Sequence, residues 1–216
     1  MIQFENVTAT YTSSAGIFDL SFEIPKGEIV FLMGPTGSGK STVLRTIYKE
    51  INIEKGKIIL DGEDITRIKK RQIPFLRRKI GMIFQDFKLI PDRSVYENIA
   101  LPLRISGEKS MVIKKEVYEI CEKVGLKDKE KVYPRHLSGG EQQRVSIARA
   151  LIKKPRIILA DEPTGNLDPV ISDDILDIME IATENGAAVL MATHNFPLIQ
   201  PRKKRFIKLN KGLKVN

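Results

Sequence analysis

Nine consecutive residues combine the types and the spacing that a phosphate-binding site requires. They follow an apolar run at residues 29–33 and precede a stretch from Val43 whose apolar residues recur at helical spacing. The pattern G-x-x-x-x-G-K-S between a strand and a helix is typical of a loop that binds phosphate groups. Its glycines let the backbone fold around phosphate oxygens, and its amides converge on the anion where the helix dipole favours negative charge. The nine residues are Gly34, Pro35, Thr36, Gly37, Ser38, Gly39, Lys40, Ser41 and Thr42.

Two side chains of this loop have chemistry of their own. Lys40 supplies a positive charge for the β- and γ-phosphates of a nucleoside triphosphate, and the Ser41 hydroxyl is a ligand for Mg²⁺. A glycine-rich turn before an ordinary helix is the alternative interpretation. The strand before the loop and the helix after it favour the nucleotide site.

An acidic pair, Asp161 and Glu162, follows a second buried run at residues 156–160. Ligands of open α/β sheets bind at the carboxyl ends of the strands. Asp161 can hold Mg²⁺ there, directly or through water, and Glu162 can orient and activate the attacking water. A merely solvated pair is the alternative, and the phosphate-binding loop elsewhere in the chain makes it the weaker one.

Two further side chains are candidates for the same site. His194 follows an apolar run at residues 187–192, so we expect it at the same sheet edge, which favours a polar catalytic contact over a structural role. Tyr11 lies near the end of the first expected strand, where its ring can stack on adenine. Packing is the commoner role of a tyrosine in that position.

The helix expected after residue 138 admits two interpretations. Ser138 and Glu141 have the spacing of a capping box, which is a plain helix start. Gly139 and Gly140 leave the first amides of this helix bare, so the same residues also suit a second anion site. Both interpretations fit the pattern equally well. Further on, Asp168 before a proline predicts the N-cap of another helix.

The pattern of apolar residues predicts an α/β fold around these motifs. Alternation at residues 2–7 and 18–24 predicts two half-buried antiparallel strands. Turn signals around a short apolar run predict a strand pair within residues 54–65. Residues 86–150 have helical periodicity, with a capping signature from Ser94, and are expected to form a mainly helical insertion. Strands are also expected at residues 80–84, 156–160, 187–192 and 205–209.

Composition limits the class of protein. A chain of 216 residues is long enough for one domain with a smaller lobe. It has no apolar run of the 18 or so residues that a membrane span requires, and its N-terminus lacks the features of a signal peptide. The single cysteine, Cys121, excludes an internal disulfide framework, fits a reducing cytoplasm and lies on an amphipathic pattern that predicts burial.

The net charge of +9 raises the question of an anionic partner. The basic clusters are scattered along the chain without interleaved aromatic residues, so they do not resemble a base-stacking surface. A solvated face is the first interpretation, attraction to an anionic membrane surface the second, and nucleic acid the third. The clusters lie at residues 69–71, 77–79, 114–115 and 202–205.

Together, the ordered motifs resemble the ATPase subunits of ATP-binding cassette (ABC) transporters along nearly the whole chain. They are GPTGSGKST, Gln85 after a strand, LSGGE followed by QQR, IILADE, GNLD and TH. The resemblance implies one domain over residues 1–216 with the P-loop ABC ATPase fold, a mixed β-sheet core. A RecA-like core with an antiparallel N-terminal β subdomain would occupy about 1–85 and 151–216, and an α-helical subdomain 86–150.

The resemblance also implies roles for individual residues. Two chains would bind two ATP molecules head to tail, so that Ser138, Gly139, Gly140 and Glu141 contact the γ-phosphate held by the other subunit. Asn195 stands where these ATPases commonly have aspartate. The implied roles are Tyr11 stacking on adenine, Gln85 contacting Mg²⁺ and the membrane partner, Asp168 linking the two sites, Glu162 as catalytic glutamate and His194 as γ-phosphate switch.

Within the family, residues 80–95 are most similar to the cell-division ATPases. This implies a peripheral protein on the cytoplasmic face of the cell membrane that drives an FtsX-like, permease-type protein and thereby regulates cell-wall hydrolases. ATPases of lipoprotein-releasing or macrolide-efflux transporters are the alternative. A non-hydrolysing nucleotide-gated module is disfavoured because Lys40, Glu162 and His194 are all present. A soluble nucleic-acid protein is disfavoured because the chain has neither a second cassette nor a long inserted arm.

Overall fold

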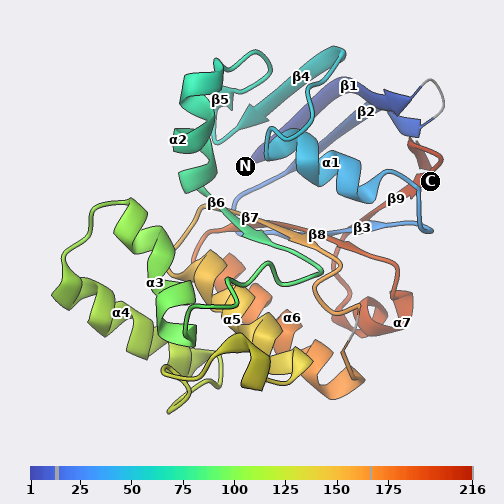
Figure 1. Cartoon of the computed structure of the whole chain (residues 1–216). Helices are drawn as coiled ribbons and strands as arrows, with labels where there is room; N and C mark the ends of the chain where they lie inside the picture. The colour runs from blue at the N-terminus through green and yellow to red at the C-terminus, as the bar shows by residue number, and fades with distance from the viewer. Residues whose placement is uncertain (13–14, 166, 216) are drawn as a thin grey trace.

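In the part of the chain that the structure describes, two β-sheets lie one above the other, with helix α1 (Lys40–Ile47) between them (Figure 1). The computed structural model describes residues 1–12, 15–165 and 167–215, and the side chains of residues 11 and 12 are outside the described part. Within these ranges, the smaller sheet has four strands in the order β2-β1-β4-β5, and the larger has six in the order β10-β9-β3-β8-β7-β6. The predicted fold, a mixed α/β core with an antiparallel N-terminal sheet, is confirmed.

The smaller sheet is antiparallel throughout and contains the strands predicted from alternation. Ile2 faces Ile24 on one neighbouring strand and Leu60 on the other, and all three side chains are buried. Apolar residues on alternate positions therefore place one face of the sheet against the core. The strands are β1 (Ile2–Thr12), β2 (Ala15–Ile24), β4 (Lys55–Leu60) and β5 (Glu63–Asp64).

The larger sheet is parallel except for its last strand. Its central strands read as continuous apolar runs because helices or the other sheet cover both faces. Every residue of β3 is buried, and alternate residues face opposite layers: Val30 and Leu32 on one side, Ile29 and Phe31 on the other. The strands are β3 (Ile29–Met33), β6 (Ile80–Ile83), β7 (Ile157–Asp161), β8 (Ala188–Thr193), β9 (Phe206–Asn210) and β10 (Leu213–Val215), the last antiparallel to β9.

Helices cover both faces of the larger sheet (Figure 1). Helix α1 (Lys40–Ile47) lies between the two sheets, and α5 (Gly139–Leu151) and α6 (Pro169–Glu184) lie on the opposite face. As predicted, Asp168 caps α6, since its carboxylate accepts a hydrogen bond of 3.0 Å from the Ile171 amide. A short helix, α7 (Phe196–Ile199), follows β8.

A separate hydrophobic cluster forms where α3 (Val95–Ile105), α4 (Ser110–Lys123) and one face of α5 pack together. Helix α3 begins with the predicted capping box, in which Ser94 and Glu97 bond each other's backbone amides. Cys121 is buried in this cluster, and burial raises the pKa of its thiol to about 12.

Helix α5 joins the helical layer to the sheet because it contributes to two hydrophobic clusters. Val145 and Ala148 pack with α3 and α4, whereas Ile147 and Ala150 pack beneath the larger sheet. The division into a core and a helical subdomain over residues 86–150 stays a prediction, with α5 at its boundary.

The sequence did not predict helix α2 (Ile73–Arg78), which is too short to show a helical period. Short 3₁₀ segments at Lys70–Gln72, Pro134–His136 and Gln200–Arg202 were missed for the same reason. Across the described ranges, none of the helices has the length and apolar character needed to cross a membrane.

Replacing Gly81 by alanine is expected to destabilise the fold. A Cβ at this position in β6 would lie 2.7 Å from the Ala150 carbonyl oxygen of α5. Overpacking of this kind costs about 1–3 kcal/mol, and denaturant unfolding measures it. Gly139→Ala is the matched control, since its Cβ would meet only a Leu167 methyl group at 3.9 Å. Equal stability of the two variants would contradict this account of the β6–α5 contact.

Candidate nucleotide site

The predicted phosphate-binding loop connects β3 to α1. Gly34 has a φ of 154°, and a Cβ there would lie 2.3 Å from the Leu209 carbonyl oxygen and 2.5 Å from Ser38 Oγ. Gly39 immediately precedes α1 with a φ of 103°. The loop amides therefore begin a helix that has no side-chain cap, which leaves them available for an anion.

Lys40 is nearly buried, and its ammonium group contacts three acceptors. Nζ donates to the carbonyl oxygens of Gly34 at 2.7 Å and Pro35 at 3.2 Å, and it lies 3.3 Å from Glu162 Oε1. A buried ammonium requires such partners. The side chain thus closes the loop and reaches the end of β7 at the same time.

Ser41 and Asp161 bring two oxygen atoms together from α1 and β7. Ser41 Oγ donates to Asp161 Oδ1 over 3.0 Å. Burial raises the pKa of the Asp161 carboxyl, the hydrogen bond from Ser41 opposes this, and the charge of Glu162 adds to the rise. A hydroxyl and a carboxylate are hard oxygen ligands of the kind that Mg²⁺ prefers.

Glu162 lies between a cation and a histidine. Its other oxygen, Oε2, is 2.9 Å from His194 Nδ1, and the His194 amide donates to the same atom over 3.3 Å. The Glu162 backbone has a φ of 46°, an uncommon value for a residue with a Cβ, and its amide donates to Ala192 O. Its side chain is 12% exposed, whereas that of His194 is 58% exposed.

The strand order explains why these residues meet. Met33 pairs with Thr193, and Asp161 pairs with Ala192, so β3, β7 and β8 end at one edge of the sheet. Loops that follow parallel strands at that edge form the usual ligand site of such sheets. Gln85, two residues beyond β6, reaches the same edge.

A cavity of about 440 Å³ lies at this edge, within the size range of small-ligand pockets. Sequence reasoning missed three lining residues, Ala15, Gly16 and Arg45. Arg45 could have been predicted, because residues four apart on a helix lie on the same face and Arg45 is four residues after Ser41. The predicted residues that line the cavity are Thr36, Gly37, Gly39, Lys40, Ser41, Thr42, Gln85, Glu162 and His194.

Predicted residues from two other segments, at the starts of α5 and α6, lie elsewhere. Ser138 caps α5 in a capping box with Glu141, whose carboxylate also pairs with Lys129. The side-chain pair with Lys129, and then the hydrogen bond from the Ser138 amide, lower the pKa of Glu141. Asp168 caps α6. None of these residues lines the cavity, and the side chain of Tyr11 falls outside the described part of the chain, so its adenine contact stays a prediction.

The starts of α5 and α6 nevertheless touch each other. A Cβ on Gly140 would lie 2.8 Å from Ile171 Cδ1, and one on Gly139 would lie 3.9 Å from Leu167. The motif around Ser138 and the turn capped by Asp168 therefore form one surface of the chain.

Replacing Gly34 by alanine is expected to weaken ATP binding about tenfold or more, since its Cβ would overlap the Leu209 carbonyl oxygen and displace the loop, and a loss of about 1.4 kcal/mol is a factor of ten. Titration with a fluorescent ATP analogue measures the affinity. Gly186→Ala is the control for backbone strain alone, because Gly186 has a φ of 88° and open space around it. Similar affinity losses in both variants would contradict a specific role for the Gly34 turn.

Comparison with known proteins identifies the family of the chain. The ABC transporter family model matches residues 17–165. The chain is 45% identical to the cell division ATP-binding protein FtsE of Bacillus subtilis over 216 residues, 100% of this chain and 95% of the relative. It is 49% identical to the protein of the same name from Escherichia coli strain K12 over 213 residues, 98% of this chain and 96% of the relative.

Solved structures agree. A dimeric bacterial ABC transporter cassette superposes with a TM-score of 0.91 at 35% identity, covering 100% of this chain and 97% of the other. A dimeric ATP-binding cassette in a post-hydrolysis state, bound to ADP and phosphate, superposes with a TM-score of 0.90 at 34% identity and the same coverage. The chain therefore belongs to the ABC transporter ATPase family, and it binds and hydrolyses ATP.

Proposed function

We propose that the chain is the ATPase subunit of a cell-division machine, working as a head-to-tail homodimer that drives an FtsX-like, permease-type membrane protein from the cytoplasmic face of the membrane. Relatives named for cell division, at 45% and 49% identity, support the cell-division role. The observation that carries the chemistry is the meeting of Lys40, Ser41, Asp161, Glu162 and His194 at one sheet edge.

Mg²⁺ fits the oxygen atoms that meet at this edge. Ser41 and Asp161 would hold it, with Gln85 as a further oxygen ligand from the cavity wall. In the described residues, no three His, Cys, Asp or Glu side chains gather into a metal cluster, and a site completed by phosphates and water does not need one. When bound, Mg²⁺ neutralises charge on the β- and γ-phosphates.

Each protein group around the γ-phosphate has a separate role in hydrolysis. Lys40 binds the β- and γ-phosphates, and this contact replaces part of its present pairing with the loop carbonyls and Glu162. Glu162 orients the attacking water and accepts its proton. His194 holds the carboxylate through Nδ1 and contacts the γ-phosphate.

The homodimer is supported by the position of the residues that do not line the cavity. Ser138, Gly139, Gly140 and Glu141 lie at the start of α5, next to the turn that Asp168 caps. In a head-to-tail pair, this surface of one subunit covers the phosphates held by the other. Each composite site then takes its catalytic carboxylate from one chain and its closing anion contacts from the other.

Replacing Glu162 by glutamine is expected to lower kcat by about 100-fold or more, since a positioned general base contributes 10²–10⁴-fold. Glutamine keeps the shape of the side chain, so ATP binding should persist. Phosphate release measures turnover, and a fluorescent ATP analogue measures binding.

The same variant tests the homodimer. Slow hydrolysis lets the ATP-bound state accumulate, so sedimentation with Mg-ATP should show a dimer. Combining Glu162→Gln with Ser138→Arg should return it to monomer, because the larger side chain blocks the surface at the start of α5. Undiminished hydrolysis in Glu162→Gln would remove Glu162 from the base role, and a monomer in both variants would contradict the homodimer.

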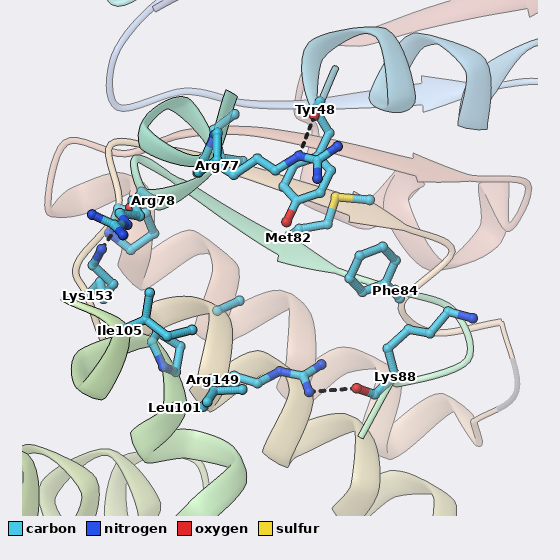
Figure 2. A pocket seen from close by; sticks show the side chains of 15 residues that line it. Tyr48, Arg77, Arg78, Met82, Phe84, Lys88, Leu101, Ile105, Arg149 and Lys153 are labelled. Carbon is cyan, nitrogen blue, oxygen red and sulfur yellow. Dashed lines mark hydrogen bonds between the residues drawn. The ribbon is translucent and has the colours of Figure 1, made fainter. Parts of the chain in front are cut away.

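We infer that the membrane partner docks in a groove of about 420 Å³ between α2, β6 and α3 (Figure 2). Tyr48, Met82 and Phe84 line it on one side, and Leu101 and Ile105 on the other. The groove adjoins Gln85, because Phe84 directly precedes that residue. Ile105 is 54% exposed, so an apolar contact is available there.

Charge identifies the kind of segment that fits this groove. Among the residues that the structure describes, its lining includes five cations and no Asp or Glu. Within the described residues, Arg77, Arg149 and Lys153 donate only to backbone carbonyls and lie in no ion pair. The occupant is thus a segment of the membrane partner with apolar and acidic side chains. The five cations are Arg77, Arg78, Lys88, Arg149 and Lys153.

Reversing the charge at the rim of this groove is expected to weaken the partner complex about tenfold, since like charges across an interface cost several kcal/mol when close. Arg78→Glu is the test variant, and Arg104→Glu on α3, exposed and outside the groove, is the matched control. Co-expression with the FtsX-like protein and affinity purification from solubilised membranes measures the complex.

Hydrolysis by the isolated subunit should be unchanged in both variants. Equal losses of partner from both would contradict docking in this groove. A wild-type chain that copurifies instead with a lipoprotein-releasing or macrolide-efflux permease would replace the cell-division role with a transport role.

A further inference from the structure

Arg149, on the last turn of α5, holds the loop that contains Gln85 (Figure 2). Its guanidinium group donates through Nη1 to the Lys88 carbonyl and through Nη2 to the Phe87 carbonyl, each over 2.7 Å. A planar guanidinium suits two neighbouring acceptors, which a single ammonium does not match. The two hydrogen bonds therefore fix both position and orientation of this loop.

The loop needs such support because of its backbone. Phe87 and Lys88 are consecutive residues with φ values of 58° and 49°, in the left-handed region that side chains disfavour. Such conformations persist only where the surrounding structure holds them. Among the described residues, the turn's own backbone hydrogen bonds run from the Phe87 amide to Phe84 O and from the Lys88 amide to Asp86 O, and the exposed Lys88 ammonium pairs with the Asp86 carboxylate at 2.6 Å. Gln85 lies inside this turn.

Removing the Arg149 guanidinium from water costs free energy, which argues against an incidental contact. It is partly buried, and burial lowers the pKa of its guanidinium, although the group stays charged. No carboxylate in the described residues pairs with it, so the two carbonyls carry its hydrogen bonding. A desolvated cation kept on two carbonyls stabilises their particular geometry.

The other end of α5 carries the motif that begins with Ser138. The helix is uninterrupted from Gly139 to Leu151, so about 16 Å of rigid rod separates Ser138 from Arg149. The close approach of Gly81 to the Ala150 carbonyl, where a Cβ would lie at 2.7 Å, holds the end of this rod against β6. A continuous helix therefore joins the Ser138 motif to the residue that holds the Gln85 loop.

We propose that Arg149 is a positioning residue that couples the Ser138 end of α5 to Gln85, so that Gln85 reaches the nucleotide only when α5 is seated. This rests on the proposed function, in which Gln85 is a ligand at the Mg-ATP site. Arg149 itself does not line the nucleotide cavity.

Arg149→Ala tests the coupling, with Arg149→Lys as the conservative variant and Arg71→Ala, at an exposed position, as the control. In Arg149→Ala, kcat should fall about tenfold while KM for ATP stays within about twofold, as for a lost transition-state interaction. Hydrogen exchange should accelerate at residues 85–90 and nowhere else. Low-millimolar guanidinium should restore part of kcat, and equimolar ammonium should not. Arg149→Lys should fall between the wild type and Arg149→Ala.

A purely structural role would give a different pattern, with a lowered Tm, faster exchange along the whole chain and no rescue by guanidinium, and that pattern would overturn the proposal. Unchanged exchange at residues 85–90 would also overturn it. Gln85→Ala distinguishes a failure of the proposed function from a failure of this inference. Full kcat in that variant would refute the role of Gln85 in the proposed function, and the exchange data would still decide whether Arg149 holds the loop.

Discussion

The nucleotide site depends on one carboxylate held between two partners of different kinds. Glu162 has Lys40 against one oxygen and His194 against the other, at 3.3 Å and 2.9 Å. A buried charge is tolerated only when its neighbours satisfy it. Lys40 is the first residue of α1, which follows β3, and His194 directly follows β8. Both can reach Glu162, at the end of β7, only if β3, β7 and β8 end at the same edge of the sheet. The parallel sheet, buried on both faces, meets that requirement.

The sequence predicted what depends on neighbours along the chain. The loop from Gly34 to Thr42, the capping box at Ser94 and the N-cap at Asp168 follow from short patterns whose physics is local, and the capping box at Ser138 is one of the two interpretations that its pattern allows. Continuous apolar runs located the buried strands, and the alternating ones located the antiparallel sheet.

Contacts between segments far apart in the sequence could not be predicted from local patterns. The pairing of Lys40 with Glu162 requires the strand order, which no single run of residues specifies. Arg149 gives no local sign that its guanidinium reaches the Phe87 and Lys88 carbonyls, since 61 residues separate it from Lys88. Helix α2 was missed because six residues are too few for a period, and packing stabilises it more than propensity does.

Helix α1 has its two ends at two different surfaces. Lys40, its first residue, lines the nucleotide cavity, and Tyr48, its C-cap, lines the groove beside α3. Arg77 ties that second end to α2 by donating to the Tyr48 carbonyl and stacking over its ring. Any ligand that shifts this short helix alters both surfaces. Thermodynamic linkage makes the effect mutual: if bound nucleotide changes the affinity of the groove for its occupant by some factor, the bound occupant changes the affinity for nucleotide by the same factor.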